Sequence, residues 1–240
     1  MLVGTDPVGG GPDCTLEAAG EEVPLTLAQA RDATMLAAAT YRGGRTQQAL
    51  AGALGPALED AEGGLTPSQA SAALARPGPA GDRLPLARAL LGYGEQRLAC
   101  RAGADGVDRE AEGPGGLTPR ADVAREQVLG AFGPLPLGGF APGGVRTGHV
   151  EGSAHYEGRA VDVFFRPVDA RNRRRGWTTA QWLLARAEPL DLDVLIFDRR
   201  LWSVGRAEDG WRPYRHPGGD TGNAVLDHLD HVHVDVLRGT

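Results

Sequence analysis

The sequence predicts an α+β protein, in which a small, mainly antiparallel sheet with flanking helices follows an alanine-rich helical N-terminal region. Two observations predict this class. After about residue 117, short strand-like runs alternate with helix-like segments, and prolines and glycines fill the connections. Before residue 110, apolar residues recur at helical spacing among many alanines. With 240 residues, 41% of them hydrophobic and 23% charged, the chain has the composition of a globular protein with a buried core.

The N-terminal region is expected to consist of helices. Thr26 can cap the first of them, and Gly43 with Gly44 can end it. Alanine supplies most of the apolar positions, so the cores between these helices should be thin. The segments with helical periodicity are 25–41, 46–60 and 85–99.

The composition changes near residue 115. All six histidines and all four tryptophans lie beyond that point. A glycine-rich stretch at 111–117 has the composition of a linker. We therefore predict a helical region over 1–110, a linker over 111–117 and a second domain over 118–240.

The second domain should contain both helices and strands. Thr118 can cap a helix over 119–132, and Thr178 or Thr179 can cap another that runs to about Glu188. Apolar and alternating runs then predict four short strands, over 160–165, 193–197, 201–203 and 231–237.

Charge and hydropathy bear on the partners of the chain. The formal net charge is −6, so no basic footprint indicates nucleic acid. A short arginine run at 171–175 is expected to be a solvated loop. No apolar run approaches the ~20 residues that span a bilayer, so no membrane span is expected. The N-terminus lacks the basic and apolar regions of a signal peptide, so either the protein is cytosolic or a signal or anchor was removed.

The two cysteines leave alternatives open. Cys14 and Cys100 lack the short spacing of a zinc or redox motif. In an exported protein, one disulfide that closes a long loop is the natural interpretation. Two unrelated buried thiols are an equally acceptable interpretation.

Histidines and an aspartate indicate a metal site. Alternation in the last strand places His231 and His233 on one face and valines on the other. His155 lies just before the strand that carries Asp162, and Gly158 supplies the backbone freedom for the sharp turn between them. Zinc accepts imidazole nitrogen and carboxylate oxygen, and a catalytic zinc site uses three protein ligands plus water.

The two histidine motifs resemble those of a known superfamily. Residues 153–162, SAHYEGRAVD, are similar to the SxHxxGxAxD signature of LAS-type zinc peptidases, and 231–233, HVH, to the terminal HxH of that group. The superfamily includes D-alanyl-D-alanine carboxypeptidases and dipeptidases, phage endolysin endopeptidases and the Hedgehog signalling domain. The similarity extends over 117–237. This part of the chain resembles a C-terminal domain common in secreted actinobacterial proteins.

This resemblance implies roles for the residues of the motifs. His155, Asp162 and His233 would ligate Zn²⁺. Asp230, three positions before the last ligand, would be the general base that takes a proton from the metal-bound water. His231 would hydrogen-bond the water or stabilise the oxyanion. A solvated turn residue is the open alternative for Asp230.

Substrate contacts are implied less directly. Ser153 would help to bind substrate, or would only cap a local turn. Many relatives carry an arginine for the substrate carboxylate where this chain has Ala141, and Arg146 is the expected substitute because a guanidinium group suits a carboxylate. His149 and His216 are expected to be surface histidines.

Two functions are compatible with this resemblance. The first is a zinc-dependent peptidase that hydrolyses peptide bonds in cell-wall peptidoglycan stem peptides, as a carboxypeptidase or an endopeptidase. The alternative is a non-catalytic, zinc-stabilised binding module that recognises a cell-wall component or a partner protein. A wall-directed family implies an exported protein, extracellular or cell-wall associated. We expect it to be a monomer with a Cys14–Cys100 disulfide.

Overall fold

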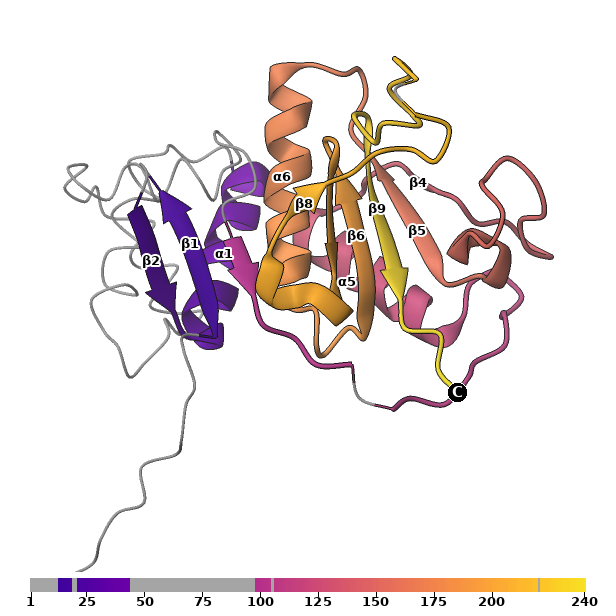
Figure 1. The fold of residues 1–240 in the computed structure, drawn as a ribbon, viewed down its shortest axis with the longest axis horizontal. Coiled ribbons are helices and arrows are strands. Elements are labelled where there is room, and N and C mark those ends of the chain that lie inside the picture. The colour runs from indigo at the N-terminus through magenta and orange to yellow at the C-terminus, as the bar shows by residue number, and fades with distance from the viewer. Residues whose placement is uncertain (1–12, 19–20, 44–97, 105, 220) are drawn as a thin grey trace, which may run out of the picture.

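The computed structural model describes residues 13–18, 21–43, 98–104, 106–219 and 221–240. It confirms the α+β class. Its strands form a three-stranded sheet and a six-stranded sheet (Figure 1), and every strand pair in both is antiparallel. No helix among the described residues is long and apolar enough to cross a membrane.

The small sheet lies in the region for which the sequence predicts only helices. Its strand order is β2-β1-β3, with β1 at Cys14–Ala18, β2 at Glu21–Leu25 and β3 at Leu98–Cys100. The end of the helix predicted over 85–99 is therefore wrong, because buried Leu98 pairs with buried Leu16 across the sheet. The rest of that segment and the helix predicted over 46–60 lie outside the described residues.

A disulfide links two neighbouring strands of this sheet. Cys14 of β1 is paired in register with Cys100 of β3, and their sulfur atoms are bonded. The expected disulfide is thus present, and it joins residues 86 positions apart in the sequence. Disulfides of this kind persist in oxidising compartments.

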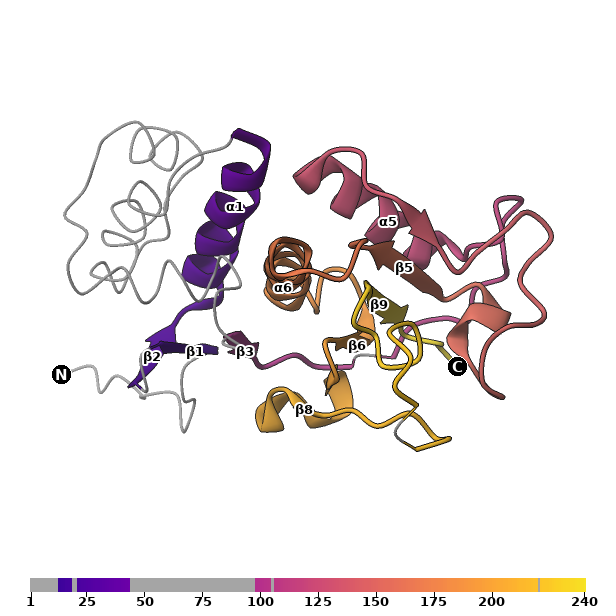
Figure 2. The same ribbon diagram turned by 90° about the horizontal axis from the view of Figure 1, so that it is seen from above.

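The first predicted helix is confirmed. Helix α1 spans Leu27–Gly43 and starts after Thr26, whose hydroxyl accepts a hydrogen bond from the amide of Gln29 (3.2 Å). The Gln29 side chain accepts one from the Thr26 amide in return (2.8 Å), which completes a capping box. Arg31 donates to the carbonyl of Ala185 (3.1 Å), so this N-terminal helix packs beside the C-terminal part (Figure 2).

The large sheet has the strand order β4-β5-β9-β6-β7-β8. Strand β9, the last in the sequence, lies between β5 and β6 and makes a full ladder with β5. The strand bounds are β4 Leu137–Gly138, β5 Ala160–Phe164, β6 Leu192–Phe197, β7 Arg200–Ser203, β8 Arg212–Pro213 and β9 His231–Val236. Short 3-10 helices occur at Ala154–Glu157 (η1) and Val204–Asp209 (η2).

Two helices cover one face of the large sheet, as Figure 2 shows. Helix α5 spans Pro119–Phe132 and is capped by Thr118, whose side chain accepts from the amide of Ala121, as predicted. The valines of β5 and β9 are buried in the same hydrophobic cluster as Ala121 and Leu183. The histidines of β9 lie on its opposite face.

Helix α6 begins earlier than predicted. It spans Ala170–Leu184, and its cap is Asp169, whose carboxylate accepts from the amide of Asn172 (2.7 Å). Thr178 and Thr179 are buried inside the helix, where their hydroxyls donate to carbonyl groups one turn earlier. The arginine run 171–175 is consequently helical and not a loop.

The boundary predicted at 111–117 stays a prediction. Residues on both sides of it contribute to one hydrophobic cluster, among them Ala33 of α1 and Leu184 of α6. Trp211 also donates its indole N–H to the carbonyl of Leu98 in β3 (3.0 Å). The N-terminal elements therefore pack on the C-terminal part through both apolar and polar contacts.

Candidate metal centre

The candidate metal ligands are brought together by the pairing of β5 with β9. The antiparallel register places Asp162 directly opposite His233, and side chains opposite each other on one sheet face lie close together. The third residue, His155, comes from η1, which precedes β5. This short helix ends at Gly158, whose φ of +65° is the left-handed conformation that the predicted turn required.

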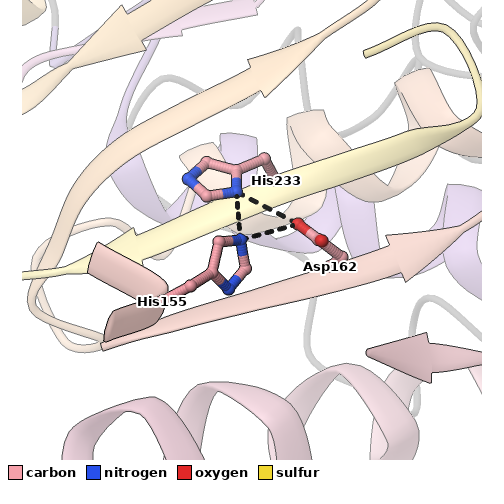
Figure 3. A group of neighbouring side chains, drawn as sticks. All are labelled: His155, Asp162 and His233. Atoms are coloured by element: carbon pink, nitrogen blue, oxygen red, sulfur yellow. Dashed lines mark hydrogen bonds and ion pairs between the residues drawn. The ribbon is translucent and has the colours of Figure 1, made fainter. Parts of the chain in front are cut away.

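The three side chains point toward one another, as Figure 3 shows. His155 Nε2 lies 3.1 Å from His233 Nδ1 and 3.3 Å from Asp162 Oδ1, and His233 Nδ1 lies 3.0 Å from Asp162 Oδ1. Ligands about 2.0–2.1 Å from a tetrahedral zinc ion would be separated by roughly 3.3 Å. One donor atom from each residue thus occupies one corner of a triangle of the right size for a metal ion, and all three residues are buried.

The ring nitrogens that face away from this triangle also have partners. His155 Nδ1 lies 2.7 Å from the carbonyl oxygen of Gly139, and His233 Nε2 lies 2.7 Å from Asp235 Oδ1. A carbonyl or carboxylate that accepts from one imidazole nitrogen leaves the other nitrogen unprotonated and able to ligate a metal. The carbonyl of Gly139 therefore favours the tautomer of His155 that can bind a metal, and Asp235 lies against the outer nitrogen of His233.

Electrostatics favour the charged form of the aspartate. Burial works against ionisation of Asp162, but hydrogen bonds with His155 and His233 outweigh it, so the pKa of this carboxyl is well below its usual range. Burial likewise disfavours protonated His233, but Asp235 and Asp162 outweigh that effect and raise its pKa. The site thus attracts a positive charge, which a proton or a metal ion can supply.

Asp230 and His231 form a second pair next to the cluster. Asp230 precedes β9 and is buried; its Oδ1 lies 2.8 Å from His231 Nδ1, and its Oδ2 accepts from Arg166 Nε at 2.6 Å. Burial raises the pKa of Asp230, but the bonds with His231 and Arg166 outweigh it and the net shift is downward. The other nitrogen of His231, Nε2, lies 3.6 Å from Asp162 Oδ1 and so faces the cluster.

An open cleft of about 540 Å³ lies over the cluster, and all six histidines of the chain line it. His149 and His216, predicted to be surface histidines, are half-exposed and lie in the lining of this cleft. The His149 ring stacks on that of His155 with centroids 4.0 Å apart. Its backbone is held by Tyr156, whose hydroxyl donates to the His149 carbonyl (2.6 Å).

His228 was not identified from the sequence. It lines the cleft, and its ring centroid lies 4.7 Å from that of His231. Burial, together with nearby His233 and His231, lowers the pKa of His228 to about 2, so it is neutral. The only sequence signal was its position three residues before His231, which is no regular strand spacing.

The two predicted substrate residues are placed differently. Ser153 lines the cleft, and its hydroxyl accepts from the amide of His155 at 3.4 Å. Arg146 is not one of the described residues that line the cleft. Its guanidinium group instead pairs with both carboxylate oxygens of Glu112, each at 3.2 Å.

The fold and the site define an α+β protein with a buried two-histidine, one-carboxylate cluster beneath an open cleft, a group that can hold a metal ion. Residues 113–225, somewhat less than half of the chain, match the family described as VldE, C-terminal domain. No curated protein and no solved structure matches the chain. The matched stretch contains His155 and Asp162 and ends before His231 and His233.

Proposed function

We propose that this protein is an exported zinc-dependent peptidase that hydrolyses peptide bonds in cell-wall peptidoglycan stem peptides. The single observation that carries the proposal is the triangle of His155, Asp162 and His233 donor atoms, 3.0–3.3 Å apart, at the base of an open cleft. The likeness of the two motifs to LAS-type zinc peptidases supplies the substrate class. The disulfide supports export.

The donor set suits zinc, the metal that the motif resemblance implies. Two imidazole nitrogens and one carboxylate oxygen make a three-ligand set that leaves a fourth tetrahedral position for water, as in catalytic zinc sites. A closed structural site would need a fourth protein ligand, and the described residues include only three in the group. When bound, zinc would lower the pKa of a water molecule and polarise the substrate carbonyl.

The geometry suggests roles for Asp230 and His231 that differ from those predicted from the sequence. Both oxygens of Asp230 have partners, His231 Nδ1 and Arg166 Nε. If Asp230 accepts from Nδ1–H, then Nε2 of His231 carries the lone pair and faces the metal cluster. We therefore assign the general base to His231 and the role of holding its tautomer to Asp230.

One observation favours the alternative function. Arg146, the expected partner of the substrate carboxylate, is bound to Glu112 and does not line the cleft. Without Arg146 the cleft lacks the substrate contact that the resemblance implies. This arrangement would suit a zinc-stabilised module that recognises a wall component without cutting it.

The test is digestion of purified stem peptides by the zinc-loaded chain, read by mass spectrometry. His231→Ala and Asp230→Asn should each retain zinc and lose about 10²–10⁴-fold in turnover. Because the two residues act as one unit, the double variant should lose little more than either single variant. Asp122→Asn, which removes an acid paired with Arg125 on α5, is the control that should keep full activity.

The outcomes separate the two functions. Zinc at one equivalent without cleavage of any stem peptide favours the binding module. Losses that add in the double variant would show that Asp230 and His231 act independently, and the proposed pairing would then be wrong.

A further inference from the structure

A second cavity adjoins the metal cleft. It has a volume of about 610 Å³, and it shares the segment Tyr214–His216 with the metal cleft as a common wall. The arginines that line it are Arg173, Arg199, Arg200 and Arg215, and we call this cavity the arginine groove. A ligand held over the metal cluster could extend into it past that common wall.

The groove keeps a positive charge although the whole chain carries −6. Four arginines line it against two aspartates, Asp198 and Asp227. Asp198 accepts from Arg173 at 2.6 Å and from the Trp177 indole at 2.8 Å. Both aspartate side chains are largely buried, at 11% and 7% exposure, and each forms an ion pair with one groove arginine, Asp198 with Arg173 and Asp227 with Arg199. The formal charge of the four arginines therefore exceeds that of the two aspartates by two.

The backbone fixes the groove in position. Asp198 and Arg199 both have positive φ, 50° and 60°, and form the two-residue turn between β6 and β7, which is the geometry of a tight hairpin. The carbonyl of Arg199 accepts from the amide of Tyr214 (2.8 Å). Asp227 also holds the Arg199 side chain, with Oδ2 at 2.7 Å from Nη2. A backbone hydrogen bond thus joins the β6–β7 turn to the common wall.

Arg215 differs from the other three arginines. It is exposed, it lines both the groove and the metal cleft, and it makes no hydrogen bond or ion pair with any residue that the structure describes. A guanidinium group binds a carboxylate through two parallel N–H···O bonds. Arg215 therefore offers, at the edge of the cleft, the group that Arg146 does not supply.

We propose that the arginine groove, with Arg215 at its entrance, binds a carboxylate on the part of the substrate peptide that lies beyond the scissile bond. This rests on the proposed peptidase function. The groove then selects peptides that carry a free carboxylate there over the same peptides in which that group is an amide.

The experiment uses the full zinc-loaded chain and two stem peptides with the same scissile bond, one with a free carboxylate beyond that bond and one with an amide in its place. Wild-type protein should cleave the carboxylate peptide with a kcat/KM about tenfold higher, the lower range for a charge-assisted hydrogen bond. Arg215→Gln should lose that preference, mainly through a higher KM for the carboxylate peptide. Arg206→Gln, which removes an exposed arginine outside both cavities that pairs with Asp209, should keep it.

A binding measurement separates failure of this inference from failure of the proposed function. If wild-type protein cuts neither peptide, calorimetry still compares their affinities. Tighter binding of the carboxylate peptide that depends on Arg215 then supports the groove, and equal affinity overturns it. Retention of the preference by Arg215→Gln also overturns it. Inorganic phosphate that binds the groove more tightly than the carboxylate peptide would overturn it too, and would identify a phosphate ligand instead.

Discussion

Replacement of Gly139 by alanine should weaken metal binding although Gly139 offers no side chain to the metal. Its carbonyl oxygen lies 2.7 Å from His155 Nδ1. A Cβ at this position would lie 2.2 Å from His155 Cε1, 2.5 Å from Nδ1 and 3.1 Å from Asp162 Oδ2. Because non-bonded carbon atoms pack at about 3.5–4.0 Å, the imidazole must move by on the order of 1 Å.

Two costs follow from this substitution, and they can be separated. Gly139 has a φ of +80°, so alanine there costs about 1–2 kcal/mol of stability from backbone strain alone. The displaced His155 ring also loses its alignment and its carbonyl partner. Loss of such an outer-sphere partner typically lowers metal affinity by about 10–100-fold.

Gly143→Ala is the matched control. Gly143 has the same φ of +80°, and a Cβ added there would meet no atom within 4 Å, so this variant carries the strain without the clash. The assay is titration of metal-free protein with zinc in competition with a chelating dye, beside thermal unfolding. Both variants should unfold at lower temperature, but only Gly139→Ala should bind zinc more weakly. Equal zinc affinity in the two variants would refute the role assigned to Gly139.

The remaining predictions concern the metal, the disulfide and the domain boundary. Elemental analysis should find one zinc per chain, lost in His155→Ala and kept in His216→Ala; no stoichiometric metal in wild-type protein would contradict the site. Thiol titration of the unfolded, unreduced protein should find no free thiol, and reduction should lower the free energy of unfolding by up to about 4–5 kcal/mol, because the bond closes a loop of 86 residues. Residues 117–240 expressed alone should fold with zinc, although the fragment lacks the contacts of Trp211 with Leu98 and of Ala185 with Arg31; an unfolded fragment would contradict the boundary.

Local patterns in the sequence were sufficient for the centre of the site. Alternation indicated which residues of β9 share a face, and a glycine between His155 and Asp162 indicated the turn that brings them together. Thr118 marked the start of α5 because its capping chemistry is local. These features depend on neighbours within a few residues, which a sequence displays directly.

Features that depend on distant partners could not be predicted. Strand β3 has three residues, and its pairing with β1 joins segments more than 80 positions apart. The first turns of α6 consist largely of arginines and have no apolar face, so Asp169 was the only local sign of their start. The position of Arg215 beside the cleft and the ion pair of Arg146 with Glu112 are likewise set by tertiary packing.

The place of β9 in the sheet has a consequence for shortened chains. Strand β9 comes last in the sequence but lies between β5 and β6. A product that stops before His231 would not lose an outer strand. Its sheet would instead be divided into two pieces, each with a newly exposed edge of unpaired backbone groups. Such edges promote pairing with other chains. Incomplete synthesis or C-terminal proteolysis would therefore convert this protein into an aggregation-prone species and not into a smaller, inactive one.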